Sequence, residues 1–407
     1  MKVALHTLGC KLNQAETEKL ARELLEAGHR PVGNVSEADV CILNTCTVTH
    51  VADSKSRRWL RAAHRRNPEA WLVATGCYAE RKPEELVGIE GVSLVVGNNE
   101  KSCFLRLVEN VGRSSFPDSA DGGLHKKVKI GRTRAFIKVQ DGCSRSCAYC
   151  IVPKVRGAEK SRPAGQVVTE VKQRVGEGCQ EVVLTGTEVG AYQDGLGLKG
   201  LLERILTETG VPRLRLSSLQ PQEISPGLLE LWGDGRLCPH FHLSLQSGDD
   251  RVLGRMRRGY SAAGYERAVR LIRSVVPEAA ISTDIIVGFP GETEAEFEQS
   301  YDFCRNQGFS RIHVFPYSLR PGTEASEMPG QLGARVKKER SEKMLVLAQE
   351  SSFKFEEQFA GCTMPVLWEE KTDGVWSGFT GNYIRAYTRS DRELANTILP
   401  VKLAKLT

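Results

Sequence analysis

The sequence predicts an α/β protein with a small all-β region at its C-terminal end. Apolar, strand-like runs alternate with helix-like stretches in residues 1–112, and the same alternation returns in residues 132–333. This pattern is typical of parallel sheets covered by helices. Residues 361–407 instead hold short alternating runs separated by Gly and Asp turns, which favours a small antiparallel β-barrel of the oligonucleotide-binding type.

The N-terminal domain, residues 1–112, is expected to be a doubly wound parallel sheet. The apolar runs predict three strands and two helices, with strands at 3–8, 40–44 and 71–75 and helices at 13–27 and 54–66. Asn13 is predicted to cap the first helix, because its side chain can accept from early backbone N–H groups while Glu16 reaches back. Gly28 suits the end of that helix.

A cysteine follows each of the three expected strands, in the strings LGC, NTC and TGC: Cys10, Cys46 and Cys77. Residues just beyond the carboxyl ends of parallel strands meet at one edge of the sheet, where ligands bind. The three thiols are therefore expected to converge and hold a metal centre. The alternative is that they are buried structural thiols, as free cysteines often are. Cys41, inside an apolar run, is interpreted as such a core thiol.

Residues 113–131 are polar and irregular, which predicts a linker, and residues 132–333 then predict a barrel. Six strand–helix units are expected, with strands at 135–139, 181–184, 213–217, 241–245, 281–287 and 311–315. A complete barrel needs eight units, so a partial (βα)6 barrel is predicted. A long charged helix at 334–360 is expected to connect the barrel to the C-terminal region.

Three cysteines with the spacing C-x₃-C-x₂-C follow the first expected barrel strand: Cys143, Cys147 and Cys150. Three thiolates can hold three irons of a four-iron cluster and leave one iron open for a substrate or cofactor. Zinc sites commonly use two pairs of ligands, and no second pair follows nearby. A disulfide is disfavoured because the number is odd and nothing indicates secretion. Structural thiols remain an alternative.

Basic residues gather in three stretches that a polyanion could reach: 55–66, 126–138 and 255–258. In the C-terminal region, aromatic residues and arginines are interleaved, which suits RNA binding by base stacking and phosphate contact. The alternatives are solvated helix faces for the basic runs and a barrel core for the aromatic residues.

The composition is that of an ordinary globular protein. The 407 residues are 40% hydrophobic and 26% charged, with a net charge of +6, and no apolar run approaches the length of a membrane span. The first residues are interpreted as a strand and not as a signal peptide. Twelve cysteines then suggest thiolate chemistry in a reducing compartment, so the cytoplasm is expected.

The cysteine motif, with Tyr149 before its last cysteine, resembles the radical S-adenosylmethionine superfamily, and the surrounding GCSRSCAYCIVPKVRG resembles its methylthiotransferases. The resemblance extends over the chain through LTGTEVGAY (184–192), SLQSGDDRVLGRMRRGY (244–260), TDIIVGFPGET (283–293) and FPYSLRPGT (315–323). The strings GCKLNQAETE, NTCTVTHVADSKSRR and GFTGNYIRAY resemble the branch that acts on threonylcarbamoyladenosine in tRNA. The isopentenyladenosine branch tends to have GCQMN and the ribosomal-protein branch GCPKN at the first cysteine.

The resemblance implies two [4Fe–4S] clusters and S-adenosylmethionine as cofactors. The cluster on Cys143, Cys147 and Cys150 would chelate S-adenosylmethionine, whose one-electron cleavage gives a 5′-deoxyadenosyl radical. The second cluster, on the three N-terminal cysteines, would hold or supply sulfur, and a second S-adenosylmethionine would supply the methyl group. The product would be a methylthio group at C2 of the modified adenosine at position 37, beside the anticodon.

Further site residues are implied around the cofactor. Thr185, Gly186 and Glu188 stand where the superfamily has a GGE-like strand end that meets the methionine amino group, although this chain has TGTE. Gln246 and Asp284 are expected near the cofactor's ribose or carboxylate. Gly288 would serve the adenine or simply allow a tight strand-to-helix turn.

The resemblance also implies a C-terminal TRAM domain and the anticodon stem-loop of tRNA as partner. The expected RNA contacts are Arg57, Arg58, Arg61, Lys127, Lys129, Tyr383 and Arg385. A flavodoxin or ferredoxin is expected as electron donor, the sulfur donor is not indicated, and a monomer without membrane attachment is expected.

Three alternatives remain open at this point. The same chemistry could act on isopentenyladenosine in tRNA or on a ribosomal protein. The chain could instead be a noncatalytic iron–sulfur protein that binds RNA or senses redox state. The second cluster could also be an electron relay, but a relay favours four protein ligands and each set here has three.

Overall fold

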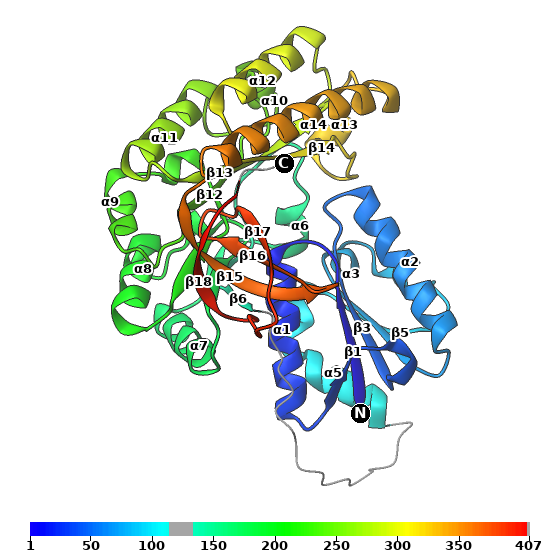
Figure 1. Ribbon diagram of the computed structural model, residues 1–407. Helices are drawn as coiled ribbons and strands as arrows, with labels where there is room; N and C mark the ends of the chain where they lie inside the picture. The colour runs from blue at the N-terminus through cyan, green and yellow to red at the C-terminus, as the bar shows by residue number, and fades with distance from the viewer. Residues whose placement is uncertain (114–132, 405–407) are drawn as a thin grey trace. The chain divides into compact units, whose positions relative to one another are not determined.

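The computed structural model describes residues 1–113 and 133–404, which fall into two compact units (Figure 1). The first unit contains the N-terminal residues together with two short segments, 142–144 and 150–158. The second contains 133–141, 145–149 and the remainder from 159 onward. The expected linker lies outside the described residues apart from residue 113. In the described part of the chain, no helix combines the length and the apolar character needed to cross a membrane.

The first unit is built on a parallel five-stranded sheet in the order β2-β1-β3-β4-β5. Its strands are β1 (Lys2–Thr7), β2 (Arg30–Val32), β3 (Val40–Thr45), β4 (Trp71–Gly76) and β5 (Val92–Val96). Its helices are α1 (Lys11–Glu26), α2 (His50–Arg66), α3 (Cys77–Arg81), α4 (Pro83–Val87) and α5 (Phe104–Arg113), with 3₁₀ turns at Val35–Glu37 and Asn98–Cys103. The three predicted strands are present, and two edge strands are added to them.

Helices cover both faces of this sheet, as a doubly wound fold requires. On one face α1 and α5 pack on β1, β3 and β4 through a core that includes Leu24, Ile42 and Phe104. On the other face α2 and α3 pack through Leu60 and Tyr78, both of which are fully buried. The fold class predicted for this region is therefore confirmed.

The start of α1 differs from the sequence prediction. Cys10, not Asn13, is the N-cap residue, and Asn13 lies inside the helix and is fully buried. The Asn13 amide donates to the backbone oxygens of Leu8 at 2.8 Å and Thr45 at 3.0 Å. The side chain therefore ties the loop after β1 to the end of β3, because two buried carbonyl groups there need a donor.

The second unit contains the six predicted barrel strands, all parallel to their neighbours. Together with the short strand β11, which was not predicted, they form two adjoining sheets, β10-β9-β6 and β11-β12-β13-β14. The strands are β6 (Arg134–Lys138), β9 (Glu181–Thr185), β10 (Arg213–Leu216), β11 (Ser218–Leu219), β12 (His240–Leu243), β13 (Ala280–Val287) and β14 (Arg311–Pro316). A short antiparallel pair, β7 (Gln140–Asp141) and β8 (Lys160–Ser161), accompanies them.

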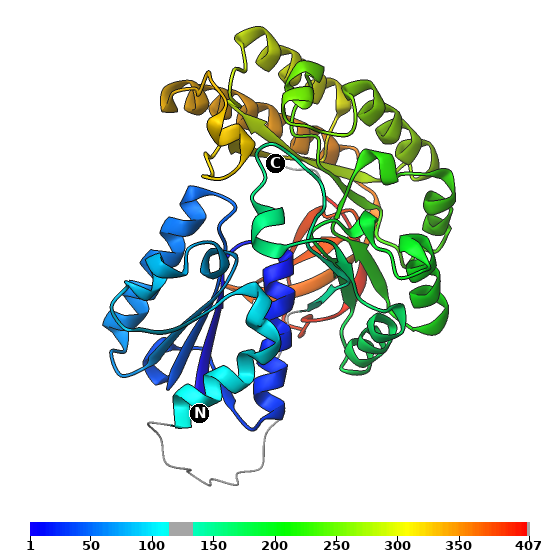
Figure 2. The same ribbon diagram turned by 180° about the vertical axis from the view of Figure 1, so that it is seen from behind.

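Helices lie along one side of these strands, as Figures 1 and 2 show. The longer ones are α7 (Ala164–Gly176), α8 (Gly197–Glu208), α11 (Ala262–Val275), α12 (Glu294–Gln307) and α14 (Ala334–Glu357). Shorter helices are α9 (Pro226–Leu229), α10 (Asp250–Arg255) and α13 (Glu324–Glu327), with 3₁₀ turns at Val189–Ala191, Pro221–Glu223 and Glu230–Gly233. α6 (Val152–Arg156) belongs to the first unit.

The C-terminal region is an antiparallel sheet in the order β17-β16-β15-β18. Its strands are β15 (Thr363–Thr372), β16 (Val375–Thr380), β17 (Arg385–Arg389) and β18 (Ile398–Lys402). The sheet curls into a half-barrel, which agrees with the small antiparallel β-barrel expected from the sequence. Trp368 and Trp376 are 1% and 3% exposed in its core, so the core interpretation of these aromatic residues holds.

A buried ionic network joins this sheet to the barrel strands. Glu181 accepts two hydrogen bonds from Arg215, at 2.8 and 3.1 Å, and both side chains are fully buried. Arg215 also donates to the Gly381 carbonyl at 2.8 Å, and its guanidinium lies 3.6 Å from the centre of the Tyr383 ring. Burial opposes ionisation of Glu181, but Arg215 outweighs it and lowers the Glu181 pKa.

Removing one partner of this pair should destabilise the second unit strongly. Glu181→Ala leaves Arg215 buried without its carboxylate, which typically costs about 3–5 kcal/mol of unfolding free energy. Denaturant unfolding of the full chain, followed by tryptophan fluorescence, measures the loss. Glu203→Ala, which removes a solvent-exposed pair on α8, is the control and should change stability little. Equal stability of the two variants would contradict the role given to the network.

Candidate iron–sulfur and cofactor sites

Cys10, Cys46 and Cys77 follow β1, β3 and β4, which are neighbours in the sheet. The structure brings the three residues to one sheet edge, close enough for their thiols to interact electrostatically. Burial raises the pKa of Cys46 to about 12, and the thiols of Cys10 and Cys77 contribute in the same direction. A bound metal centre reverses this balance, because it deprotonates the thiols that bind it.

Two glycines allow this close approach. Gly9 has φ +103°, and a Cβ atom there would lie 2.6 Å from Cys46 Cβ and 2.9 Å from its Sγ. Gly76 has φ +96°, and a Cβ atom there would lie 2.5 Å from the Thr45 carbonyl oxygen. Only glycine fits both the backbone conformation and the space. Steric constraint therefore explains why a glycine precedes the cysteine in the LGC and TGC strings.

Cationic side chains stand beside these thiols. Arg156 is almost completely buried, forms an ion pair with Glu16 at 3.0 Å and donates to Asn13 Oδ1 at 2.6 Å. Lys101 also pairs with Glu16, at 2.5 Å, and burial lowers its pKa. Arg156 acts electrostatically on Cys10 and Cys46 and favours their thiolate forms.

The donor set fits a four-iron cluster with three protein ligands. Three thiols converge, and positive charge from Arg156 and Lys101 stands near them to offset thiolate and cluster charge. Asn98 adds a weak contact from its Nδ2 to Cys77 Sγ at 3.7 Å. No prediction from the sequence included these surrounding residues. The one local signal was that Arg156 lies in the same motif string as Cys150.

The motif at 143–150 is divided between the two units, so its parts are described separately. In the first unit, the Cys143 backbone N–H donates to the Gly157 carbonyl at 3.1 Å. Cys150 begins the segment that leads into α6, whose Val155 packs with Cys77 and Ile151.

In the second unit, Arg258 stands next to Cys147. Its Nη1 lies 3.4 Å from Cys147 Sγ and also 3.4 Å from the Tyr149 hydroxyl. Burial disfavours the charged guanidinium, but Tyr149, Tyr260 and Cys147 more than compensate and raise the Arg258 pKa. In the sequence Arg258 belongs to a basic run, 255–258, that was predicted to be open to a polyanion. The structure instead places it against a cluster cysteine, because Gln220 and Tyr260 hold it there.

The other two members of that basic run are also paired within the second unit. Arg255 forms an ion pair with Glu296 at 2.9 Å, and Arg257 forms one with Glu324 at 2.7 Å. The run is therefore used for internal contacts.

The TGTE strand end contacts the cluster motif from within the second unit. Glu188 is 3% exposed and accepts from Arg145 Nε at 2.6 Å, while its backbone N–H donates to Gln140 Oε1 at 2.9 Å. Arg145 also pairs with Glu223 at 3.4 Å. Burial, and then the hydrogen bond with Glu188, raises the pKa of Glu223 to about 8.

Thr185 ends β9, and Gly186 follows at a point of close approach. A Cβ atom on Gly186 would lie 2.9 Å from the Gln140 carbonyl oxygen. The strand end therefore lies against β7 as tightly as its backbone permits.

Gln246 and Gly288 mark strand ends in the second sheet of barrel strands, β11-β12-β13-β14. Gln246 has φ 72°, and its backbone bridges to β13 through Asp284 and Ile286 at 2.8 and 2.9 Å. Gly288 has φ +72°, and its N–H donates to Glu292 at 2.6 Å. Glu292 is in turn paired with Arg340 of α14 at 2.7 Å, so the turn interpretation of this glycine has a structural basis.

Asp284 lies deeper than these strand ends. Its carboxylate accepts from Ser244 at 3.3 Å and is paired with His242 at 3.1 Å. The Asp284 carboxylate therefore contacts histidine and serine side chains and not the backbone of the turn at Gly288.

The residues expected to contact RNA fall in different environments. Arg58 and Arg61 are exposed on α2, whereas Arg57 donates to the Tyr78 hydroxyl at 2.5 Å and pairs with Glu85 at 3.6 Å. In the C-terminal sheet Arg385 is exposed, and the ring of Tyr383 packs between Arg215 and His240. Lys127 and Lys129 lie outside the described residues.

Comparison with known proteins gives the class first. Residues 137–304 match the Radical SAM superfamily, and residues 2–97 match the group described as Uncharacterized protein family UPF0004. The chain is also similar to a solved structure of the radical S-adenosylmethionine methyltransferase TsrM from Kitasatospora setae, which has cobalamin and a [4Fe–4S] cluster bound. The superposition covers 92% of this chain and 80% of TsrM, with a TM-score of 0.59. At 16% identity this likeness shows the fold alone. The parallel barrel strands and the cysteine motif that follows the first of them are those of a radical S-adenosylmethionine enzyme.

Closer relatives define the family. The protein named threonylcarbamoyladenosine tRNA methylthiotransferase MtaB is 34% identical in Bacillus subtilis, over 99% of this chain and 94% of the relative. Its counterpart in Aquifex aeolicus is 38% identical over 98% and 99%. A tRNA-2-methylthio-N(6)-dimethylallyladenosine synthase of Pelotomaculum thermopropionicum is 34% identical over 100% and 97%. The chain belongs to the radical S-adenosylmethionine methylthiotransferase family, as its motifs predicted. Family membership also confirms the predicted cofactors, two [4Fe–4S] clusters and S-adenosylmethionine.

A methyl group added at Gly9 should empty the N-terminal site selectively. Gly9→Ala introduces a Cβ atom that overlaps Cys46 in a backbone conformation that favours glycine. We expect the iron content per chain of anaerobically reconstituted protein to fall by about half, because one of two four-iron clusters is lost. Gly33→Ala is the matched control, since its added Cβ meets nothing within 4 Å. Full iron content in Gly9→Ala would contradict this account.

Proposed function

We propose that this enzyme adds a methylthio group to C2 of N6-threonylcarbamoyladenosine at position 37 of tRNA. The observation that carries the proposal is the presence of two separate three-cysteine sets, one after the first barrel strand and one at the edge of the N-terminal sheet. The relatives named for this nucleoside in Bacillus subtilis and Aquifex aeolicus support the choice of substrate. Relatives named for dimethylallyladenosine are the main alternative.

The two cysteine sets have different tasks in this proposal. Cys143, Cys147 and Cys150 hold the cluster that binds S-adenosylmethionine, and the bound pair supplies radical chemistry. Cys10, Cys46 and Cys77 hold the cluster that handles sulfur. Three ligands in each set leave one iron open, which suits binding of a small ligand better than electron relay.

The neighbouring side chains orient and balance charge. Arg258 offsets the thiolate charge of Cys147, at 3.4 Å, and Arg156 does the same for the N-terminal thiols. The carboxylate of Glu188, close to Thr185 and Gly186, is the group we assign to the cofactor's ammonium. In this structure Arg145 donates a hydrogen bond to the Glu188 carboxylate at 2.6 Å. Glu223, 3.4 Å from Arg145, can serve as an alternative partner for Arg145.

The strand ends at Gln246 and Gly288 would hold the rest of the cofactor. The backbone of Gln246 is fixed by its bridge to β13, and Gly288 is fixed by Glu292. Both positions are therefore held before any ligand arrives, which lowers the entropic cost of binding.

The RNA partner would be bound by exposed cations on both units. On α2 these include Arg58 and Arg61, and on the C-terminal sheet Arg385 stands beside the exposed ring of Tyr387, 5.3 Å from its centre. A cation next to an exposed ring can contact a phosphate while the ring stacks on a base. Arg57 and Tyr383 would support these surfaces from within, and we assign the C-terminal sheet to the TRAM type.

Nucleoside mass spectrometry of tRNA tests this proposal. Cells that lack the gene should lose 2-methylthio-threonylcarbamoyladenosine and regain it with the wild-type gene. Cys46→Ala should fail to restore it, yet the purified variant should still cleave S-adenosylmethionine to 5′-deoxyadenosine. Cys362→Ala, at an exposed cysteine that belongs to neither set, is the control and should restore the nucleoside. An unchanged nucleoside in the deletion strain would overturn the substrate, and methylthiolation by Cys46→Ala would overturn the division of tasks.

The RNA surface on α2 is tested by its salt dependence. Arg58→Gln combined with Arg61→Gln removes two exposed positive charges, so the slope of log affinity against log salt for tRNA should become shallower by about 1.5. Filter binding over a range of salt concentrations measures the slope. Arg270→Gln on α11, whose side chain is 68% exposed and pairs only with a neighbour one helical turn away, is the control. An unchanged slope in the double variant would remove α2 from the RNA interface.

A further inference from the structure

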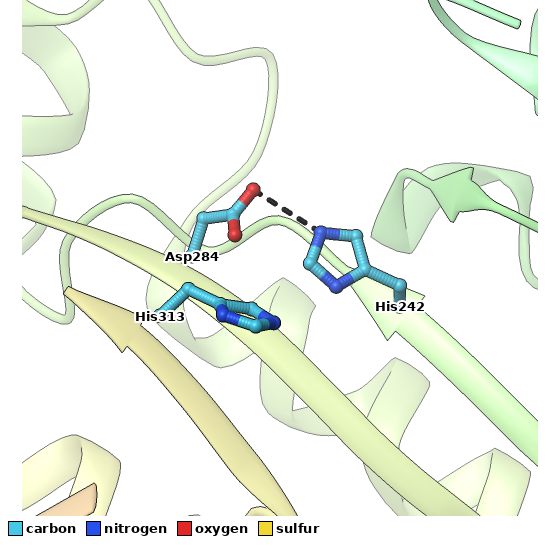
Figure 3. A group of neighbouring side chains, drawn as sticks. All are labelled: His242, Asp284 and His313. Carbon is cyan, nitrogen blue, oxygen red and sulfur yellow. Dashed lines mark hydrogen bonds and ion pairs between the residues drawn. The ribbon is translucent and has the colours of Figure 1, made fainter. Parts of the chain in front are cut away.

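A polar layer crosses three neighbouring strands of the second unit. His242 on β12, Asp284 on β13 and His313 on β14 lie side by side, as Figure 3 shows. Asp284 is directly opposite His313 in the parallel register, and His242 is opposite Ser282, two residues before Asp284. One ligand atom of each of the three side chains lies within 4.8 Å of the other two.

Hydrogen bonds fix the positions of two members of this layer. His242 Nδ1 lies 3.0 Å from Ser282 Oγ, and its Nε2 lies 3.1 Å from Asp284 Oδ2. Ser244 also donates to Asp284, at 3.3 Å. The ring of His313 lies 5.8 Å from that of His242, centre to centre. The layer therefore offers imidazole nitrogens and a carboxylate in one defined arrangement.

The layer lies on the face of the sheet that the helices do not cover. Residues of the opposite parity, such as Phe241, Ile285 and Ile312, are buried in the main core with the helices. In contrast, the side chains of His242 and Asp284 keep 13% and 25% of their surface exposed, and His313 is also partly exposed. Two residues earlier on β12, His240 is closed off by the edge of the Tyr383 ring.

Charge in the layer is balanced around Asp284. Burial disfavours its ionised form, but His242, and then His313 and Ser244, outweigh burial and lower the Asp284 pKa. The carboxylate is therefore an acceptor at neutral pH, and the imidazoles around it can donate. A polar ligand that brings both a donor and an acceptor would satisfy such a layer.

The depth of the layer matches a substituent of the target base. His242 and Asp284 each come four residues before a residue at the strand ends, Gln246 and Gly288. At about 3.3 Å per residue this separation is about 13 Å. A base whose C2 reacts at the strand ends would carry its N6 substituent toward this depth.

We propose that His242, Asp284 and His313 form the specificity site for the N6 group of the target adenosine. This inference rests on the proposed function. A threonylcarbamoyl group carries a carboxylate that can accept from imidazole N–H, and an N–H and a hydroxyl that can donate to Asp284. A dimethylallyl group has no polar atom. When bound, it would cover the polar side chains of the layer and leave them without hydrogen-bond partners from the ligand. A site built to hydrogen-bond its ligand rejects an analogue that lacks those groups far more strongly than an apolar pocket does.

The same three side chains also resemble a two-histidine, one-carboxylate metal site. A divalent cation is therefore a distinct outcome that the experiment must detect. We favour the nucleoside because Ser282 and Ser244 already complete a hydrogen-bond network around His242 and Asp284. Serine hydroxyls are poor ligands for the transition metals that such a site selects.

The test compares two anticodon stem-loops that differ only in the N6 group, threonylcarbamoyl or dimethylallyl. For each enzyme we would measure the dissociation constants of both RNAs and the kcat/KM for methylthiolation. Wild type should prefer the threonylcarbamoyl RNA. In His313→Phe this preference should fall by at least about tenfold in both measurements. His313→Gln, which keeps a donor and an acceptor, should stay within about threefold of wild type.

Asp284→Asn is a second, nearly isosteric variant for the case that His313→Phe does not fold. Its preference for the threonylcarbamoyl RNA should also fall. An unchanged preference in the folded variants, with wild type active on the threonylcarbamoyl RNA, would overturn this inference alone. Wild type inactive on that RNA would overturn the proposed function, and this inference with it. Elemental analysis of wild type is the last arm: a metal beyond the iron of the clusters that disappears in His313→Phe would assign the layer to a cation and overturn the inference.

Discussion

Parallel pairing of adjacent strands is the constraint on which every candidate site in this protein depends. β1, β3 and β4 run in the same direction as direct neighbours, so the residues after them reach one edge. This brings together three cysteines that are far apart in the chain. In the second unit the same rule puts Thr185, Gln246 and Gly288 at strand ends, and it sets the polar layer at one depth below them.

Burial decides what the cations of this protein do. Arg215, Arg258 and Arg156 are all drawn into the interior, where each meets a carboxylate, a thiol or both. Their desolvation is offset only because those partners are held at fixed positions. Arg58 and Arg61 remain exposed on α2 and stay available for a polyanion. Net charge along a run of sequence does not separate these two uses, since both kinds of residue can stand close together in the chain.

Much of the fold could be predicted because its signals are local. The six barrel strands and three strands of the first sheet were indicated by short runs that are apolar or alternate between apolar and polar residues, and the structure has all of them. The edge strands β2 and β5 were not predicted: β2 has only three residues, whereas the VSLVV of β5 is an apolar run like those of the predicted strands and was missed. The prediction that Asn13 caps α1 was wrong for a different reason. A side chain that serves the carbonyl of Thr45 on another strand has the same local sequence as a helix cap.

The sequence by itself determined the class of chemistry, because the C-x₃-C-x₂-C spacing is local and each of the three N-terminal cysteines closely follows a strand-like run. Only the tertiary structure decided which neighbours those cysteines have: Arg156 and Lys101 near one set and Arg258 beside Cys147. It also assembled His242, Asp284 and His313, which no local pattern connects. These contacts depend on strand register and packing between segments far apart in the chain, and a one-residue shift of a strand would turn each side chain to the opposite face.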